Sequence, residues 1–168
     1  MKEIELTKGF KTFVDDDDYE WLSANKWHSS IGYAGRAGKR VDCWRQSHIF
    51  MHREVLKRHF GWTCLDGFYV DHINGNRSDN RKENLRRCTN QQNQFNTNKH
   101  KRNTSGYKGV SWNIVDKKWQ VYLKTKDKVH FLGQFHDVKK AAEAYDKAAI
   151  KIHGEFSNIN FKEGLSHL

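Results

Sequence analysis

Residues 69–96 constrain the fold of this chain more than any other stretch, because turn and polar residues interrupt short strand-like runs there. The first run, Tyr69 and Val70, predicts a strand that ends at Asp71 and His72. The triplet 74–76 (Asn-Gly-Asn) follows and predicts a turn, since these residue types tolerate the left-handed backbone. The sequence therefore brings an acid and a histidine, side by side, to the end of a strand.

The second half of this stretch predicts another strand and a helix. A polar loop reaches Asn84, and residues 85–88 (Leu-Arg-Arg-Cys) are typical of a short strand. Thr89 is suited to cap a short helix that runs to about Phe95 and carries Asn93. Strand, loop, strand and helix form a ββα unit, whose polar residues cluster where the elements meet.

The residue types in this unit suit metal-assisted hydrolysis. Asp71 offers a carboxylate and Asn93 an amide carbonyl, both hard oxygen ligands for a hydrated Mg²⁺. His72, neutral near pH 7, can take a proton from an attacking water. Neighbouring strand residues point to opposite faces, so Asp71 and His72 share a site only if the strand ends there. Each residue considered alone has an ordinary alternative interpretation. Asn84 could end a loop, Asn93 could be a solvated or capping residue, and His72 could be a surface histidine.

The stretch resembles the HNH nucleases, whose site is a ββα-metal (His-Me) finger. The matching motifs are Asp71-His72, Asn84 within Glu-Asn-Leu-Arg, and Asn93 within Gln-Gln-Asn. The resemblance implies His72 as general base, with Asn84 beside it as the residue that braces the loop. It further implies Asp71 and Asn93 as ligands of one divalent metal, Mg²⁺ with Mn²⁺ as the alternative. An asparagine in the third motif occurs in phage-type members of that family.

Positive charge is concentrated in the part of the chain that follows Asp71-His72. Residues 1–76 carry 11 basic and 11 acidic side chains, residues 77–102 carry 8 and 2, and residues 103–168 carry 11 and 7. This distribution favours nucleic-acid binding, in which phosphate contacts supply affinity. A basic solvated surface is the alternative interpretation. The phosphate-contact candidates near the site and in the polar stretch 97–106 are Arg86, Arg87, Lys99, Lys101 and Arg102.

Residues 107–161 predict a second unit of three strands and one helix. Strands are expected on both sides of turns at 115–117 and 126–128. Asp137 is expected to cap a helix with an alanine-rich apolar stripe, and Gly154 to end it. Trp119, Val121 and Leu123 on the middle strand would face that helix.

This second unit is similar to the APETALA2-type DNA-binding domain. The matching motifs include residues 107–110 (Tyr-Lys-Gly-Val), 131–133 (Phe-Leu-Gly) and 144–146 (Ala-Tyr-Asp). The resemblance implies a sheet that docks in the major groove of double-stranded DNA. Several groove positions that hold arginine or tryptophan in plant members differ here. The residues expected to face DNA are Lys108, Ser111, Asn113, Gln120, Tyr122, Lys124 and Phe131.

The first 60 residues are predicted with less detail. Two short strands flank Gly9, and the acidic run 15–18 suits the start of a helix. Residues 27–49 predict a β-hairpin that turns at Gly38-Lys39, and residues 50–60 predict a helix. In that helix, Met51, Val55 and Leu56 share one side, and His52 is interpreted as structural.

The remaining composition excludes several classes of protein. Cys43, Cys64 and Cys88 are far apart and form no Cys-x-x-Cys zinc motif, which favours reduced thiols. No apolar run approaches a membrane span, and the N-terminus lacks the apolar region of a signal peptide. We therefore expect a cytoplasmic protein, encoded by a phage or mobile element in a bacterial host, with no obligate protein partner.

Together these patterns predict an α+β protein. Residues 1–98 would form an HNH nuclease domain with an extra β-hairpin and a finger at about 68–96. Residues 99–106 would be a basic linker, and residues 107–161 a three-stranded antiparallel sheet packed on one α-helix. The predicted function is site-specific DNA cleavage. A DNA-binding regulator without activity is the alternative. An RNA-binding protein or ribonuclease is disfavoured, because the major groove of A-form RNA is too narrow to read.

Overall fold

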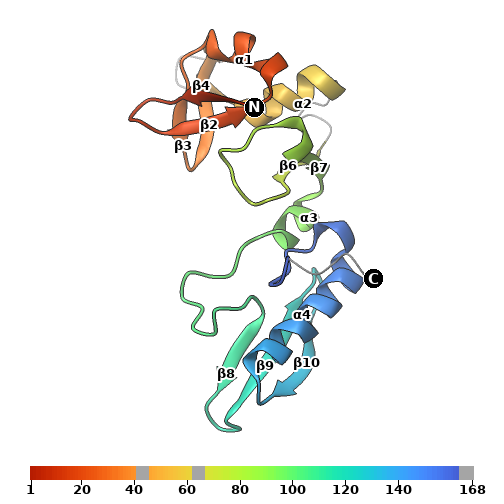
Figure 1. Cartoon of the computed structure of the whole chain (residues 1–168). Coiled ribbons are helices and arrows are strands. Elements are labelled where there is room, and N and C mark those ends of the chain that lie inside the picture. Colours follow the sequence, from red (N-terminus) through yellow and green to blue (C-terminus); the bar gives the residue numbers. More distant parts are fainter. Residues whose placement is uncertain (41–45, 62–66, 163–168) are drawn as a thin grey trace. The chain divides into compact units, whose positions relative to one another are not determined.

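The computed structural model describes residues 1–40, 46–61 and 67–162. The chain divides into two compact units, residues 1–93 and 94–168, and both combine a few helices with small sheets (Figure 1). This is the mixed composition of helix and strand that the sequence predicted. The division into a nuclease domain, a linker and a DNA-binding domain stays a prediction.

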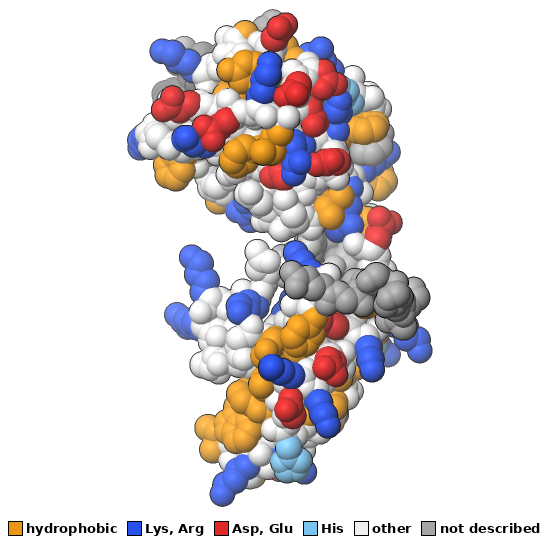
Figure 2. Space-filling model, in the orientation of Figure 1, with side chains coloured by type: hydrophobic (Ala, Val, Ile, Leu, Met, Phe, Trp, Pro, Cys, Tyr) orange, Lys and Arg blue, Asp and Glu red, His pale blue; other side chains and the backbone are white. Residues whose placement is uncertain are grey.

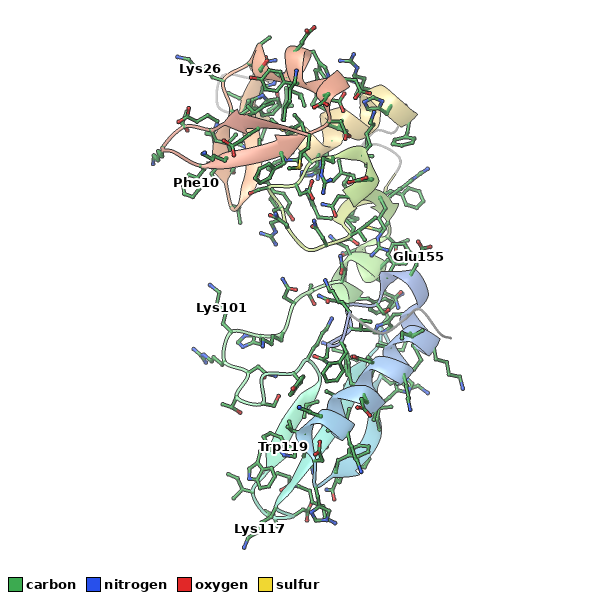
Figure 3. All side chains as sticks on the ribbon, viewed as in Figure 1. Phe10, Lys26, Lys101, Lys117, Trp119 and Glu155 are labelled. Atoms are coloured by element: carbon green, nitrogen blue, oxygen red, sulfur yellow. The ribbon has the colours of Figure 1, made fainter. Side chains whose placement is uncertain are left out.

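A hairpin and an acidic helix open the first unit. Strands β1 (Lys2–Glu5) and β2 (Lys11–Val14) pair antiparallel, and Figure 3 shows Phe10 at the tip of the hairpin. Helix α1 (Asp16–Ser23) starts in the acidic run, where carboxylates interact favourably with the helix dipole. Asp18 is an exception among these acids, because it is buried and lies 2.7 Å from Nε2 of His59.

The segment predicted as one hairpin is a three-stranded sheet. Strands β3 (His28–Ser30), β4 (Tyr33–Arg40) and β5 (Gln46–Phe50) lie in the order β3-β4-β5. The predicted turn at Gly38-Lys39 is wrong, because both residues belong to β4. A Cβ on Gly38 would lie 2.2 Å from Oγ of Ser47, so this glycine marks a close approach between strands. Cys43 and Cys64, two of the three cysteines predicted to be reduced thiols, lie outside the described residues.

Helix α2 (Met51–Phe60) packs its apolar side into the core of the first unit. Met51, Val55 and Leu56 are buried as the helical spacing predicted. They join a cluster that includes Leu22 of α1 and Trp27. Burial of apolar surface in this cluster is the main force that holds the small sheets of the unit together.

The stretch 69–96 folds into strand β6 (Tyr69–His72), a one-turn helix η2 (Lys82–Asn84), strand β7 (Leu85–Cys88) and helix α3 (Asn90–Phe95). β6 and β7 pair antiparallel. Thr89 and Gln92 form a reciprocal cap at the start of α3, since Oγ1 of Thr89 accepts from the Gln92 N–H at 3.2 Å and Oε1 of Gln92 accepts from the Thr89 N–H at 2.8 Å. Thr89 thus caps the helix as predicted.

The second unit places one helix on a three-stranded sheet. Strands β8 (Val110–Asn113), β9 (Lys118–Lys124) and β10 (Val129–Phe135) lie in the order β10-β9-β8. Helix α4 (Val138–His153) is followed by the short helix η3 (Gly154–Phe156). The side chain of Asp137 accepts from the N–H groups of residues 139 and 140, which caps α4. Val121 and Leu123 pack against the alanines of α4 in the core of this unit.

Gly109 provides a test of how closely α4 approaches the sheet. Its φ is +76°, and an added Cβ would lie 2.1 Å from Cδ2 of Tyr145 and 2.8 Å from the carbonyl oxygen of Tyr122. Gly109→Ala should lower the free energy of unfolding by about 2–4 kcal/mol, from the positive φ and from overpacking. Gly106→Ala is the matched control, because Gly106 also has a positive φ but open space around it. It should lose only about 1–2 kcal/mol. Urea unfolding followed by circular dichroism measures both, and equal losses would contradict the packing described.

Candidate active site

Asp71 and His72 are adjacent residues of β6, and both are only 4% exposed. Asp71 lies directly opposite Arg86 of β7. Nε and Nη2 of Arg86 both donate to Oδ2 of Asp71, at 2.9 and 2.7 Å. A buried carboxylate needs such a partner, because an isolated buried charge is strongly unfavourable. The cross-strand arginine therefore supplies the carboxylate of Asp71 with a partner at the end of β6.

His72 is held among polar and aromatic groups. Its Nε2 lies 3.2 Å from Oδ1 of Asn80, and its ring centroid lies 5.8 Å from that of Tyr33 and 5.3 Å from that of His52. Burial lowers the pKa of His72, although the hydrogen bond to Asn80 and the charge of Asp71 act in the opposite direction. The lowered pKa favours the neutral imidazole near pH 7, the form that can accept a proton.

Asn84 braces the loop between β6 and β7. Its Oδ1 accepts from the N–H of Asn74 at 2.9 Å, and its Nδ2 donates to the carbonyl of Asp79 at 2.8 Å. Its own carbonyl accepts from the N–H of Ile73 at 2.9 Å. The buried amide of Asn84 thus satisfies backbone groups at the start and in the middle of the loop. The sequence predicted a bracing residue here.

Asp79 forms a second brace inside the same loop. Its Oδ2 accepts from Nδ2 of Asn74 at 2.9 Å and from Nη2 of Arg81 at 2.8 Å. The hydrogen bonds from Arg81 lower the pKa of Asp79. Both the amide of Asn84 and the carboxylate of Asp79 form hydrogen bonds with Asn74. These bonds restrict the backbone conformation of the turn that follows His72.

Asn93, the second predicted metal ligand, is half-buried on α3, and its backbone N–H donates to Thr89 at 3.0 Å. The capped helix α3 therefore sets its position. In the described ranges, no group of three or more His, Cys, Asp or Glu residues is arranged to hold a metal ion. The predicted set instead combines one carboxylate with one amide carbonyl, oxygen donors that suit Mg²⁺. An arginine on one carboxylate oxygen is compatible with ligation, because ligating carboxylates are commonly hydrogen-bonded. The pair Asp71 and Asn93 stays a prediction.

His52 is buried, and its ring contacts the ring of His72 and neighbouring aromatic rings. Its ring stacks on Phe50 at 5.5 Å and meets His72 edge-on. Burial lowers its pKa well below the ordinary value for histidine. A neutral His52 avoids placing a second positive charge against the ring of His72, in accord with the structural role that the sequence analysis assigned to it.

The two arginines of β7 that were predicted to contact DNA both contact other side chains of the first unit. Arg86 is engaged with Asp71. The guanidinium of Arg87 lies 3.6 Å from the ring centroid of Phe68, a cation–π contact. Their contact with DNA stays a prediction, and the structure shows for Arg86 a pairing with Asp71 that the sequence did not predict.

Several residues of the second unit that were predicted to face DNA are accessible. Figure 3 shows Lys101 pointing away from the loop between α3 and β8. Rings of Tyr122 and Phe131 lie side by side on the face of the sheet opposite α4, with centroids 5.3 Å apart, and are 39% and 55% exposed. The other exposed members of the predicted set are Lys99, Arg102, Ser111 and Lys124.

Four members of that set are partly engaged in the protein itself. Nζ of Lys99 donates to the carbonyl of Gly106 at 2.6 Å. Nζ of Lys108 donates to the carbonyl of Phe95 at 2.7 Å, and burial lowers the pKa of Lys108 to about 8. Oδ1 of Asn113 accepts from the N–H of Val115 at 2.9 Å, which shapes the β8–β9 turn. Gln120 is half-buried and accepts from the hydroxyl of Tyr122 at 3.3 Å. Asn113 and Gln120 lie on β8 and β9, whereas Lys108 precedes β8, and the sequence did not reveal these contacts.

Sequence reasoning missed two polar residues of the site, Asn80 and Thr12. Asn80 contacts His72, and its Nδ2 donates to Oγ1 of Thr12 at 2.7 Å. Thr12 lies on β2, 60 residues before His72. No local motif joins these positions, so only the tertiary structure could reveal them.

Comparison with known proteins identifies the family of the first unit. Residues 50–95 match the family model described as HNH endonuclease. Protein 3.8 of Escherichia phage T7 is 32% identical over 93 residues, which make up 55% of this chain and 76% of the phage protein. The chain belongs to the HNH endonuclease family. An uncharacterised HNH endonuclease of Acanthamoeba polyphaga mimivirus is 29% identical over 153 residues, or 91% of this chain and 76% of the viral protein. The predicted resemblance to HNH nucleases is confirmed.

The second unit of this HNH protein has relatives among plant proteins. APETALA2-like protein 2 of rice (Oryza sativa) is 38% identical over 58 residues, which make up 34% of this chain and 13% of the plant protein. The HNH family and this similarity suggest DNA as the partner, and HNH nucleases generally depend on a divalent metal. No solved structure matches the chain. Within the described residues, each helix is too short or too polar to cross a membrane.

Proposed function

We propose that this protein is a site-specific DNA endonuclease in which His72 is the general base. The observation that carries the proposal is the buried His72, whose pKa is lowered, next to a buried Asp71 that pairs with Arg86, at the end of a strand whose following loop is held by hydrogen bonds. Both residues lie inside the segment that matches the HNH family. On this proposal β6, β7 and α3 constitute the ββα-metal finger.

His72 would take the proton of a water molecule as that water attacks the scissile phosphorus. A buried, neutral imidazole suits this role, because it binds the proton only when the attack generates it. The fixed loop keeps the imidazole in one place, and general-base catalysis depends on such positioning. A positioned base of this kind typically contributes about 10²–10⁴ in rate.

Asp71 and Asn93 would hold one divalent cation, Mg²⁺ or Mn²⁺. When bound, such a cation stabilises the charge that develops on the phosphate and on the leaving oxygen. Arg86 would hold the carboxylate of Asp71 in its orientation, and the cap on α3 would fix Asn93. We propose one cation per chain, since one ligand set is predicted. A single chain would then nick one strand, and two copies would be needed to cut both.

The sheet of the second unit would dock in the major groove of the DNA and so position the duplex. A small sheet fits this groove, and exposed aromatic and lysine side chains suit base edges and phosphates respectively. Tyr122, Phe131 and Lys124 are exposed on the face of this sheet, and Lys99, Lys101 and Arg102 supply charge on the preceding loop. Figure 2 shows further hydrophobic side chains at the end of this unit where β8 and β9 turn, where Ile114 and Val115 are exposed. We propose that Lys108, tied to Phe95, anchors the loop instead of reading bases.

Replacing the proposed base tests the assignment directly. His72→Ala should slow cleavage of a supercoiled plasmid library by at least about 10²-fold, because no other neutral imidazole takes its position. DNA affinity, measured by gel shift, should stay within about twofold, since phosphate contacts dominate binding. His136→Ala, an exposed histidine between β10 and α4, is the control and should cut normally. Equal loss of cleavage and binding in His72→Ala would count against a role in chemistry.

Metal removal distinguishes a nuclease from a DNA-binding regulator. EDTA should abolish plasmid cleavage and added Mg²⁺ should restore it. Asp71→Asn should reduce cleavage by about 10²-fold or more. The variant lacks a carboxylate ligand, so the cation that would stabilise the charge of the transition state is held less well. Asp16→Asn, at the exposed start of α1, should behave as the wild type. Full activity in EDTA would refute the metal role, and DNA binding without any cleavage would support the regulator.

Lys124 tests the DNA-binding face. Lys124→Ala should weaken DNA binding and reduce the slope of log K against log salt by about 1, the value expected for one lost phosphate contact. Lys147→Ala is the control, because Lys147 is exposed on α4, on the opposite side of the sheet. Fluorescence anisotropy at several salt concentrations measures both variants. If Lys147→Ala lowered the slope and Lys124→Ala did not, the helix and not the sheet would face DNA.

A further inference from the structure

A buried chain of hydrogen bonds leads from the N-terminal hairpin to His72. Oγ1 of Thr12 lies 2.7 Å from Nδ2 of Asn80, and Oδ1 of Asn80 lies 3.2 Å from Nε2 of His72. Thr12 and Asn80 are both 0% exposed. We propose that Thr12 and Asn80 are positioning residues that orient the His72 ring by holding its Nε2–H, which leaves Nδ1 as the basic nitrogen. This inference rests on the proposed role of His72 as the base.

The direction of the first hydrogen bond follows from chemistry. Oγ1 of Thr12 lies 2.7 Å from the carbonyl oxygen of Ser78, and a carbonyl cannot donate. The hydroxyl must therefore place its single proton on that carbonyl. Toward Asn80, Thr12 can then only accept, so the NH₂ group of Asn80 faces Thr12.

The same reasoning fixes the second hydrogen bond. With its NH₂ group directed at Thr12, Asn80 presents its carbonyl oxygen to His72. Amide oxygens accept and do not donate, so Nε2 of His72 must carry the proton. In the neutral ring the lone pair is then on Nδ1, and Nδ1 is the atom that would accept the proton of the attacking water.

Backbone contacts hold Asn80 in register with the hairpin. Its N–H donates to the carbonyl of Phe13 at 2.8 Å, and the N–H of Phe13 donates to the carbonyl of Ser78 at 2.7 Å. A flipped Asn80 amide would set its oxygen against the lone pairs of Thr12 and its NH₂ group against Nε2 of His72. At complete burial no water can repair such a mismatch, so the native amide orientation is strongly preferred.

The hairpin β1–β2 therefore belongs to the catalytic apparatus, although it lies outside the residues that match the family model, which begin at residue 50. Tyr33 and His52 restrict the His72 ring from other directions. The contact between Nε2 and the carbonyl oxygen of Asn80 favours the proton on that nitrogen, a property that packing alone does not set.

Nuclear magnetic resonance of the full chain with ¹⁵N-labelled histidine tests the proposal. Two-bond nitrogen–proton correlations of the neutral ring distinguish the two tautomers, and His72→Ala identifies the His72 signals. In the wild type we expect the Nε2–H form. A neutral His72 with its proton on Nδ1 would overturn the proposal, whether or not the protein cuts DNA.

Thr12→Val keeps the shape of the side chain and removes the hydroxyl. We expect the Asn80 amide to lose its preferred orientation, the Nδ1–H form to appear, and cleavage to fall by about 10–100-fold with DNA affinity within about twofold. Thr12→Ser should recover most of the lost cleavage, and Thr7→Val, exposed in the same part of the chain, should match the wild type. Thr12→Val with the wild-type tautomer and cleavage rate would overturn the relay.

Asn80→Leu tests the relay without removing Thr12. Leucine has a similar size and removes both the donor and the acceptor of the amide. We expect the preference for the Nε2–H form to be lost, and an unchanged tautomer would contradict the proposal. Unchanged cleavage in His72→Ala would instead reject the proposed function. The tautomer measurement does not depend on the reaction, so it tests the positioning proposal separately.

Discussion

The amide of Asn84 is the contact on which the site depends. Asp71 and His72 can both be buried at the end of β6 only if the chain leaves that strand along one fixed path. Asn84 imposes this path, because its two ends satisfy backbone groups of Asn74 and Asp79 at the same time. An asparagine suits the position because a single planar amide offers a donor and an acceptor in opposite directions.

Burying two adjacent strand residues requires partners for both side chains. Arg86 meets the carboxylate of Asp71 from the neighbouring strand. The rings of Tyr33 and His52 lie against His72, and both residues come from the part of the chain that precedes β6. The small sheets and the helix α2 of the first unit therefore act as a frame, and the acid and the base keep different electrostatic surroundings although they are neighbours in sequence.

Local structure was predictable from the sequence wherever the interacting groups lie within a few residues of each other. Thr89 and Asp137 cap their helices as expected, because a cap depends on N–H groups two or three positions away. The error at Gly38 has the opposite origin. A glycine required by the close approach of a neighbouring strand looks the same in sequence as a glycine required by a turn, and only the pairing with β5 separates the two.

Long-range contacts account for what the sequence did not reveal about the site. Asn80 lies in a loop with two other asparagines, Asn74 and Asn76, and nothing local distinguishes the one that touches His72. Lys108 stands on a strand-like segment of a basic region, yet its ammonium is tied to Phe95. Both cases depend on a partner more than ten residues away or on burial, and periodicity contains no information on either.

The boundary between the two compact units falls inside α3, since Asn93 ends the first unit and the next residue begins the second. Beyond that boundary the ring of Phe95 stacks on His153 of α4, with centroids 3.7 Å apart. A genetic exchange that swapped the second unit for another module would have to break a six-residue helix, or else supply a new partner for Phe95.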